Sequence, residues 1–501
     1  MERRDCVIGV DVGSTTVKAI AFDGAGRPLA HAAQTLNLLA SADGAAEQDP
    51  AAVLEAVSSA LADAARAAMQ AGYAVARVGL SAAMHSLIAV GGDGTPLGRA
   101  MLWMDQRPAQ AAQALWATQK GKDVYARTGA PIHAMTPLAK LIWLRERQPA
   151  LFGRAARFVS LKEWIWHAWF DAWEIDPSIA GATGLYNLRE QGWDQTALAL
   201  AGIDASRLSM VVPATHTRRG PQLAVLAGAG LAGDTAFIIG SSDGVLANLG
   251  VGATAPGELV LTIGTSLAVR AGSREPQTDV ATRLFCYALD AEHFVIGGPS
   301  NSGGIVLDWL YRQVLRGSDV ARDPATERVS GDLAALLDAA RDAHDAGLFC
   351  LPYVTGERAP LWDASATATL HGMRLHHTSA HLLRAAVEGI IFNARWIAEP
   401  LLSGTQAPRR VVATGKVLET AWIRQLVADV FGLPVLFLGG VDASVLGAAA
   451  LTNLAAGVWT WDDIAARRHL PAGTDIQPAG GEGYREQYTR FRQLCAALRA
   501  V

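Results

Sequence analysis

The N-terminal sequence alternates short apolar runs with polar turns, a pattern that predicts β-strands joined by hairpins. Residues 6–12 form a β-rich run that ends at Gly13, and residues 16–22 form a second run before the turn at 23–26. Residues 29–36 are compatible with a third strand. The chain therefore opens with strand, turn and strand.

An alanine-rich segment follows, from Asp49-Pro50 to about Gly72, in which Val53, Val57 and Leu61 recur at helical spacing. Residues 75–82 and 86–90 then predict two buried strands. Three strands followed by a helix and a further strand indicate an α/β domain.

Residues 105–235 are predicted to be mainly helical, with a tryptophan-rich stretch at 162–173. A second β-rich opening follows, with a strand at 235–240 and a strand, turn and strand over 257–270. Because this repeats the architecture of residues 7–22, we expect two related α/β halves that divide near residues 244–256. We place the two domains at 1–248 and 249–501.

The later segments complete the second half. Residues 317–331 are charged and polar, and we expect a surface excursion there. We expect helices at 304–316, 379–400, 420–431 and 443–455, and strands near 348–350, 410–413 and 434–438.

Composition narrows the class of protein. The 501 residues carry a net charge of −4, so the chain lacks the basic footprint of a nucleic-acid binder or of a protein that binds acidic membranes. No window of about 18 uninterrupted apolar residues is present, so we expect no membrane span. The four cysteines are far apart and form no CxxC pair, which fits a reducing cytoplasm: Cys6, Cys286, Cys350 and Cys495.

Two glycine-rich patterns are set aside on their context. Residues 228–233 fit GxGxxG, but they follow a helical segment and precede a strand, the reverse of the order in a dinucleotide-binding unit. Gly415-Lys416 is not part of a Walker A loop, because the upstream glycine and the following hydroxyl residue are missing.

A serine-hydrolase signature is the main rival interpretation. Residues 240–244 fit GxSxG between a strand and a predicted helix, with Ser242 as the nucleophile. A triad would then need a later acid and histidine, such as Asp290 with His293 or Asp363 with His381. This interpretation leaves the other hydroxyl-rich turns unexplained.

Four histidines gather between residues 371 and 381: His371, His376, His377 and His381. Thr378 or Ser379 is a predicted N-cap, which places His377 outside the following helix. We find no carboxylate or thiol that joins the histidines, and we therefore favour a surface or core role over zinc binding.

Two hairpin turns carry the most informative chemistry. In the first, Asp11 ends a strand, a Gly-Ser-Thr-Thr turn follows, and Lys18 lies on the next strand. Glycine lets backbone N–H groups approach an anion, hydroxyl groups and lysine bind phosphate oxygens, and an aspartate can hold a magnesium shell. Residues 262–266 (TIGTS) supply a second such turn. Two such turns, one in each half, predict a nucleotide clamped between lobes.

Several stretches give the chain a specific resemblance. They are GVDVGSTTVKAIAFD, EQDP, SAAMHSL, WMDQR, PIHAMTPLAKLIWLRE, GSSDGVLANLG, LTIGTS, GGPSNSGGIVLDW, GERAPLW, ATLHGM…HLLRAAVEG and VLGAAAL. From Val7 to about Leu451 the chain resembles the FGGY carbohydrate kinases, within the actin-like ATPase superfamily. The two signature regions correspond to residues 135–147 and 368–388, and the first departs from its pattern at Arg147.

The resemblance implies an α/β fold of two actin-like, ribonuclease H-like lobes around a central cleft. It also implies ATP and Mg²⁺ as cofactors, with Asp243 as the general base and a metal-linked group, and Asp11 as the magnesium-linked aspartate. The remaining implied nucleotide contacts are Gly13, Ser14, Thr15 and Lys18 in the first phosphate segment, Gly264 and Thr265 in the second, and Gly304, Asp308, Gly415 and Lys416 toward the nucleoside.

Gly415-Lys416 departs from the family, which usually has Gly-Gly at this adenine turn. If the turn requires a positive φ at Lys416, the side chain costs about 1 kcal/mol or more. A negative φ would leave the backbone N–H in place. We expect Lys416→Gly to keep activity and to lower the Michaelis constant for ATP, and an unchanged or raised value would remove this concern.

On the sugar side, the resemblance implies that Met84, His85 and Trp103 contact the substrate. Core packing is the alternative for Trp103, and a surface pair with Asp105 is the alternative for Arg107. A sugar acid also needs a partner for its carboxylate, and the candidates are His85, Arg107, His133, Lys162 and Arg358.

Within the family, the chain is most similar to the gluconate kinases, which implies phosphorylation of D-gluconate to 6-phospho-D-gluconate in the cytoplasm. A kinase for xylulose or another ketose or polyol is the alternative in the same family. A non-catalytic ATP-switch protein is the alternative of another class, and the presence of Asp243 speaks against it. We expect a small-molecule partner, no nucleic acid and no membrane, with a homodimer left open.

Overall fold

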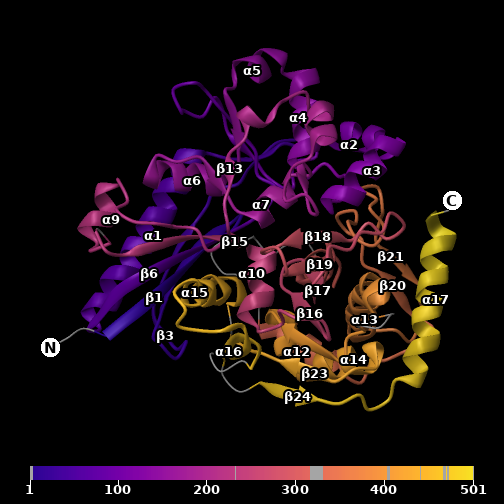
Figure 1. Ribbon diagram of the computed structural model, residues 1–501. Helices are drawn as coiled ribbons and strands as arrows, with labels where there is room; N and C mark the ends of the chain where they lie inside the picture. Colours follow the sequence, from indigo (N-terminus) through magenta and orange to yellow (C-terminus); the bar gives the residue numbers. More distant parts are fainter. Residues whose placement is uncertain are drawn as a thin grey trace. The chain divides into compact units, whose positions relative to one another are not determined.

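The computed structural model describes residues 4–231, 233–315, 331–402, 407–440, 442–466, 470 and 473–499 (Figure 1). The chain forms two compact units, each assembled from several stretches of sequence. Unit 1 comprises Met1–Ala255, Gly272–Ile296 and Asp442–Pro471, and unit 2 comprises Pro256–Ala271, Gly297–Val441 and Ala472–Val501. The domain division predicted at residue 248 stays a prediction.

A six-stranded mixed sheet, in the order β14-β15-β6-β1-β2-β3, forms the centre of unit 1. The predicted opening hairpin is confirmed, because β1 pairs with β2 and β2 with β3 in antiparallel fashion. β1 and β15 both lie parallel to β6. The bounds are β1 Arg4–Val12, β2 Thr16–Phe22, β3 Pro28–Thr35, β6 Tyr73–Ala82, β14 Thr217–Arg218 and β15 Ala236–Ser242.

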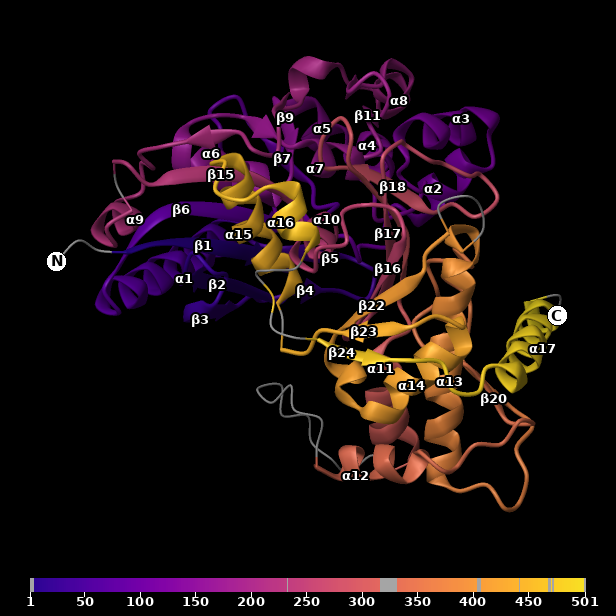
Figure 2. The same ribbon diagram turned by 60° about the horizontal axis from the view of Figure 1, so that its bottom comes forward.

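Helices cover both faces of this sheet (Figure 2). Helix α1 (Pro50–Gln70) lies on one face and begins as predicted, with the Asp49 carboxylate accepting the Ala51 N–H. Helix α15 (Ala443–Ala455) lies on the other face, against β1 and β6. A Cβ at Gly9 would lie 2.1 Å from the Val445 carbonyl oxygen, so the close approach of α15 requires glycine in the strand.

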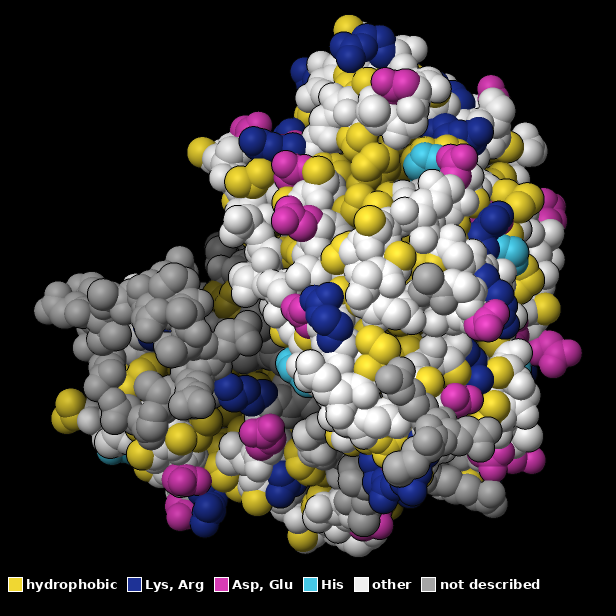
Figure 3. Space-filling model, turned by 90° about the vertical axis from the view of Figure 1, so that its left-hand side faces the viewer, with side chains coloured by type: hydrophobic (Ala, Val, Ile, Leu, Met, Phe, Trp, Pro, Cys, Tyr) yellow, Lys and Arg dark blue, Asp and Glu magenta, His cyan; other side chains and the backbone are white. Residues whose placement is uncertain are grey.

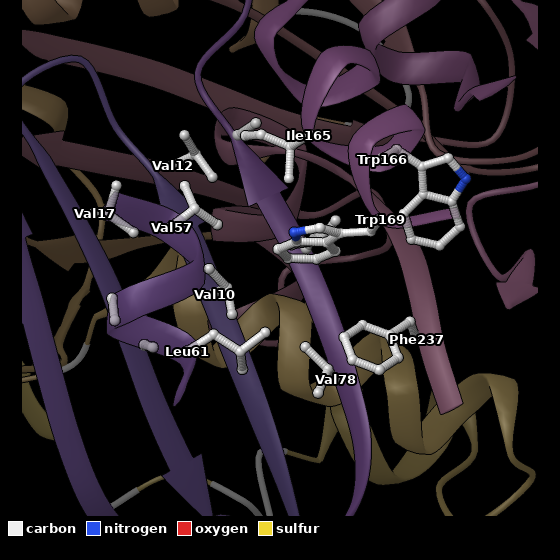
Figure 4. Packing of buried hydrophobic residues seen from close by; sticks show 14 of the residues in the cluster. Val10, Val12, Val17, Val57, Leu61, Val78, Ile165, Trp166, Trp169 and Phe237 are labelled. Carbon is white, nitrogen blue, oxygen red and sulfur yellow. The ribbon is translucent and has the colours of Figure 1, made fainter. Parts of the chain in front are cut away.

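The main core of unit 1 lies between the sheet and α1 (Figure 4). Val10 and Val78 point from the strands toward Val57 and Leu61 of α1, and all four are fully or almost fully buried. Trp169, from the predicted tryptophan-rich stretch, extends the cluster toward Phe237 of β15, with ring centroids 5.7 Å apart. This burial is the main stabilising term for the sheet that carries the candidate site.

Short helices and strands make up the rest of unit 1, and the predicted helical character of residues 105–235 is confirmed in its main part. The helices are α2 Ala109–Trp116, α3 Gln119–Thr128, α4 Pro137–Arg147, α5 Pro149–Arg154, α6 Leu161–Phe170, α7 Pro177–Ala182, α8 Gln195–Ala201, α9 Ala224–Gly228, α10 Asp243–Gly250 and α16 Trp461–Ala465, with a 3-10 turn at Ala205–Arg207. The strands are β4 Leu39–Ala40, β5 Ala46–Gln48, β7 Ile88–Val90, β8 Ala100–Met101, β9 Arg157–Val159, β10 Glu174–Ile175, β11 Tyr186–Asn187, β12 Gly192–Trp193, β13 Met210–Val211 and β18 Phe285–Ala288.

Unit 2 repeats the same design, as the sequence predicted. Strands β19-β17-β16-β22-β23-β24 follow one another in this order in a seven-stranded sheet, in which β18 is the remaining edge strand. β16 and β17 form an antiparallel hairpin, and β22 lies parallel to β16. The bounds are β16 Glu258–Ile263, β17 Leu267–Ser273, β19 Phe294–Ser300, β22 Arg410–Thr414, β23 Val435–Phe437 and β24 Thr474–Ile476, with β20 Phe349–Leu351 and β21 Thr369–His371 in a separate pair.

The helices predicted for the second half are also found. The expected helix at 304–316 divides into α11 and a short π-helix, and most of the excursion expected at 317–331 lies outside the described residues. The bounds are α11 Gly304–Trp309, π-helix Leu310–Leu315, α12 Gly331–Ala340, α13 Ser379–Ala398, α14 Ala421–Phe431 and α17 Glu482–Arg499, with 3-10 turns at Glu399–Leu401 and Lys416–Glu419.

Among the described residues, no helix combines the length and the apolarity needed to cross a bilayer. Basic and acidic side chains are intermixed on the face of the molecule shown in Figure 3. All four cysteines are buried and free.

Candidate active site

The turn between β1 and β2 places Asp11 beside Lys18. The two residues lie opposite each other in the antiparallel ladder. The Gly13 N–H donates to the Thr16 carbonyl at 3.1 Å, and a Cβ at Gly13 would lie 2.8 Å from that oxygen. This close contact requires glycine at position 13. The four residues predicted to bind phosphate lie in this turn and on the strand β2 that follows it: Gly13, Ser14, Thr15 and Lys18.

Asp11 lies among other carboxylates. Its pKa is raised to about 7, first because the group is withdrawn from water and then because Asp243 and Asp442 are negative neighbours. The Ser81 hydroxyl donates to Asp11 at 2.5 Å and acts in the opposite direction, as does Lys18. A cation would relieve this repulsion, and carboxylate oxygens are the ligands that Mg²⁺ prefers. The residues present therefore fit a magnesium ion.

Sequence reasoning missed Asp442. It precedes α15 and has the appearance of a plain N-cap, but its side chain makes no capping hydrogen bond to the helix. Instead its carboxylate accepts from the Lys18 ammonium at 2.8 Å. The two residues are 424 positions apart, so the only local signal was an aspartate before a helix.

Asp243 is the first residue of α10 and follows the buried strand β15. The N-cap of this helix is Ser242, whose hydroxyl accepts the Val245 N–H at 3.4 Å. Ser242 therefore caps the helix, and Asp243 is the first residue of its first turn. Asp243 is left at the end of the strand, near Asp11, where a carboxylate can accept a proton from a substrate.

The environment of Ser242 does not match that of a hydrolase nucleophile. Its hydroxyl is fully buried and hydrogen-bonds to the Ser178 hydroxyl in addition to the α10 amide. A serine thus occupies the place where a triad needs a histidine. His293 hydrogen-bonds to Asp290 at 2.8 Å, but its ring stacks on Trp461.

The predicted sugar residue His85 lies in a strained turn. It is buried, and its φ of 72° is unusual for a residue other than glycine. Its Nδ1 lies 2.8 Å from the Ala182 carbonyl at the end of α7, so Nδ1 is the protonated nitrogen and Nε2 carries the ring's lone pair. The start of α7 reaches Ser242 through Ser178. Helix α7 thus links the sugar loop to the strand end that carries Asp243.

Trp103 connects the predicted sugar wall to the phosphate turn. Its indole Nε1 donates to the Ser14 hydroxyl at 2.9 Å, and the Gln48 amide donates to the Ser14 carbonyl at 2.8 Å. The core-packing alternative for Trp103 is therefore not the whole account, because the indole makes a polar contact with a predicted phosphate residue.

Two candidates for the sugar carboxylate are already paired with acids. Lys162 is buried and donates to the buried Asp176 at 2.6 Å. Arg107 donates to Asp105 at 2.6 Å and also to Glu47, so the predicted pair with Asp105 is confirmed. The pair does not lie on the surface as expected, because Asp105 is fully buried. Because these cations already face carboxylates, they are weaker candidates than the others.

The other candidates have neutral partners. The Met135 N–H donates to His133 Nδ1 at 3.2 Å, and the Arg358 guanidinium donates to the Asn301 side-chain oxygen at 2.8 Å.

In unit 2 the β16–β17 turn packs against the start of α11. The amides of Gly304 and Ile305 donate to the Gly264 and Thr265 carbonyls, at 2.8 and 3.0 Å. A Cβ at Gly303 would lie 2.6 Å from the Ser266 carbonyl carbon. The structure thus brings together three of the residues predicted to contact the nucleotide: Gly264, Thr265 and Gly304.

Gly415 and Lys416 lie next to the same turn. Gly415 has a φ of 105°, and a Cβ there would lie 2.4 Å from the Ile263 carbonyl oxygen. Lys416 begins a 3-10 turn and is not among the non-glycine residues with positive φ. The positive φ of this turn therefore falls on the glycine, and the conformational cost considered for Lys416 does not arise. Asp308, on α11, accepts from Arg312 at 2.6 Å.

The histidine cluster does include a carboxylate, contrary to our expectation. Asp345 Oδ2 lies 3.0 Å from His377 Nε2 and 3.3 Å from His376 Nε2. The Arg374 N–H donates to His377 Nδ1, so the proton of that ring is on Nε2, directed at Asp345. Hydrogen bonds account for this pair, whereas a metal at Nε2 would need the opposite tautomer. Asp345 was not recognised from the sequence because it lies 32 positions before His377.

Two domain models of one protein family match most of the chain. Residues 6–250 match the N-terminal domain model of the FGGY family of carbohydrate kinases, and residues 259–456 match the C-terminal domain model. A gluconokinase from Bacillus licheniformis is 35% identical over 505 residues, which cover 98% of this chain and 96% of the relative.

Two solved structures from Lactobacillus acidophilus have the same fold. A gluconate kinase superposes with a TM-score of 0.90 and 31% identity, covering 99% of this chain and 98% of its own. A ligand-bound xylulose kinase gives a TM-score of 0.90 and 31% identity, covering 99% of both chains. These likenesses confirm the expected two-domain actin-like ATPase fold.

Proposed function

Because the chain belongs to the FGGY family of carbohydrate kinases, we propose that it transfers the γ-phosphoryl group of ATP to a hydroxyl group of a sugar acid. D-gluconate is the acceptor that we favour, with 6-phospho-D-gluconate as the product. The observation that carries this choice is the similarity to a gluconokinase along nearly the whole length of both chains. The reaction would take place in the cytoplasm, where ATP is available and free cysteines persist.

Asp243 is the proposed general base. Its carboxylate takes the proton of the acceptor hydroxyl as the hydroxyl oxygen bonds to the γ-phosphorus, and the bond from that phosphorus to the bridging oxygen breaks so that ADP leaves with the electron pair. Its place at the end of β15, as the first residue of α10, supports this role. The link from Ser242 through α7 to His85 supports a fixed distance between base and sugar loop.

Asp11 is the proposed anchor for Mg²⁺, together with Asp243. When bound, the ion would neutralise charge on the phosphate oxygens. The raised pKa of Asp11 shows how costly a negative group is here without a counter-charge. Asp442 contributes negative charge to the same region and also binds Lys18.

The phosphates of ATP are proposed to bind both hairpin turns. In unit 1, Gly13, Ser14, Thr15 and Lys18 supply backbone N–H groups, hydroxyls and charge. In unit 2, Gly264 and Thr265 supply the second set, and the nucleoside would lie toward Gly304, Asp308, Gly415 and Lys416. The packing of Gly304 and Gly415 against the β16–β17 turn supports this assignment.

The acceptor sugar is proposed to bind at Met84, His85 and Trp103. The neutral His85 ring can accept a hydroxyl proton at Nε2, because its Nδ1 faces the Ala182 carbonyl. The carboxylate candidates are His85, Arg107, His133, Lys162 and Arg358, and of these Lys162 and Arg107 bind acids in the structure.

The alternative is a ketose acceptor. The xylulose kinase structure matches this chain with the same TM-score and identity as the gluconate kinase structure, so fold similarity alone does not separate the two substrates. A measurement of ADP release over sugar acids, ketoses and polyols would do so.

We expect D-gluconate to give the highest kcat/KM in that panel, with release dependent on Mg²⁺. If xylulose gives the highest kcat/KM, the proposed acceptor is wrong but the proposed kinase activity stands. If no member of the panel raises ADP release above the background ATPase rate, the kinase function itself is wrong and an ATP-switch protein becomes the better account.

A further inference from the structure

Lys140, on α4, is a buried cation that binds only backbone oxygens among its described hydrogen-bond partners. Its side chain is fully buried. Its ammonium donates to the carbonyl of His85, to that of Leu102 at 2.7 Å and to that of Met101 at 3.3 Å. The three hydrogen bonds of the ammonium are therefore directed at two neighbouring segments of unit 1, one at His85 and one at Met101 and Leu102.

Each of these two loops carries a residue proposed to contact the sugar. The His85 carbonyl belongs to the strained residue with a φ of 72°. The Leu102 carbonyl directly precedes Trp103, whose indole reaches Ser14. The ammonium thus bonds to both the histidine loop and the tryptophan loop, in addition to the two backbone hydrogen bonds that join Leu87 to Met101 at 2.9 Å. Through Trp103 it is also connected to the phosphate turn.

Holding a lysine here is costly for the fold. Burial lowers the pKa of Lys140 to about 7, with Arg107 acting in the same direction and Asp105 in the opposite one. An apolar side chain of similar length would fill the space without this desolvation cost. A left-handed backbone conformation in a histidine also requires support from its surroundings. The desolvation of Lys140 and the left-handed backbone of His85 both oppose folding, which suggests that the position of these loops serves binding.

We propose that Lys140 is a positioning residue for the acceptor site: it holds the His85 and Trp103 loops at a fixed separation and so sets the affinity for the sugar. The inference rests on the proposed function, because it assigns these loops to the sugar. Lys140 itself would not touch the sugar or ATP.

The first test is independent of any substrate. Hydrogen–deuterium exchange of full-length Lys140→Met is expected to increase in the peptides that contain residues 84–87 and 101–104, while peptides of α1 and β16 keep wild-type exchange. Arg207→Met is the matched control, because Arg207 also donates to two backbone carbonyls of unit 1, those of Phe152 and Ala155. It should leave both loops unchanged.

The second test is kinetic. Lys140→Met is expected to raise the KM for gluconate by about tenfold or more, since small displacements of a binding group are costly. Binding of an ATP analogue should change clearly less than the KM for gluconate, because Lys140 reaches the phosphate turn only indirectly, through the bond from Trp103 to Ser14. Arg207→Met should leave both constants near the wild-type values. If Lys140→Met is insoluble, Lys140→Gln, whose amide can still donate two hydrogen bonds, should fold and show an intermediate KM.

The outcomes separate the two ideas. If wild-type protein phosphorylates no sugar acid, the proposed function fails, and the KM test is repeated with whichever acceptor the wild type uses. If the soluble variant shows wild-type exchange in both loops, or if its KM changes no more than that of Arg207→Met, Lys140 has only a structural role and the positioning proposal is overturned.

Discussion

The indole Nε1 of Trp103 donates a hydrogen bond of 2.9 Å to the hydroxyl of Ser14. The two residues are 89 positions apart and belong to the two halves of the proposed chemistry, the sugar side and the phosphate side. A change at either residue should therefore be felt by both substrates.

Replacing Trp103 by phenylalanine keeps an aromatic ring but removes the donor. The loss of one hydrogen bond is worth about 1 kcal/mol, so we expect a KM for the sugar and for ATP about fivefold higher in steady-state assays. Trp164→Phe is the control, because Trp164 makes an equivalent bond to the Pro50 carbonyl away from the turn. Equal effects from the two variants would argue against a link between the sites.

Asp243→Asn should lower turnover strongly, while an ATP analogue still binds when Mg²⁺ is absent, since Asp243 is also a proposed Mg²⁺ ligand. The amide keeps the shape but cannot accept the proton, and a lost general base typically costs at least about a hundredfold. The measurement is kcat alongside the dissociation constant of an ATP analogue.

Ser242→Ala distinguishes the serine-hydrolase interpretation from the proposed kinase function. It removes a cap and the bond to Ser178, so we expect reduced thermal stability but a measurable kinase rate. Loss of an ATP-independent hydrolase activity in this variant would instead support a nucleophilic serine.

The buried Lys140 ammonium predicts a pH dependence of stability. Its pKa is about 7 in the folded protein and about 10.4 in an unfolded chain. Between these values the unfolded state binds more protons, so this residue's contribution favours folding more as pH rises from 7 toward 10 and is lost as pH falls through 7. The melting temperature of wild type relative to Lys140→Met should therefore rise between pH 7 and 9, and a constant difference would contradict the assigned environment.

Lys416→Gly should not improve ATP binding. The positive φ of the turn falls on Gly415, so a glycine at 416 relieves no strain. We expect a KM for ATP within about twofold of wild type, since only surface side-chain interactions change. A clear decrease would show that the side chain, by its bulk or charge, hinders the nucleotide.

Gly9→Ala tests the close packing of α15 on the sheet. The added methyl carbon would lie 2.1 Å from the Val445 carbonyl oxygen, whereas one at Gly24 would meet nothing within 4 Å. Overpacking of this kind costs typically 1–3 kcal/mol, so thermal unfolding should show a lower midpoint for Gly9→Ala and little change for Gly24→Ala. Similar midpoints for the two variants would contradict the packing.

Local sequence patterns were sufficient for most elements and for the two turns. The hairpin of β1 and β2, helix α1 with its Asp49 cap and helix α15 follow from periodicity and capping signals that operate within a few residues. The role of glycine at 13 also follows from local geometry.

Pairings across the chain were not predictable in this way. Asp442 beside Lys18, Asp345 beside His377 and Lys140 beneath the His85 loop each depend on tertiary packing that a single sequence does not encode locally. Arg107 shows the opposite case, because its partner Asp105 is two residues away and the ion pair was foreseen as an alternative. Sequence reasoning was thus strongest where the partner of a residue is close in the chain.

The return of residues 442–471 to unit 1 has a consequence for biosynthesis. One face of the central sheet is covered by α15, which is translated only after residues 297–441 of unit 2. Until then the strands, with apolar residues and bare glycines such as Gly9 on that face, stay incomplete while unit 2 is still being translated. Apolar surface and strand edges that stay uncovered during synthesis favour aggregation in general, so the late arrival of α15 prolongs that exposure.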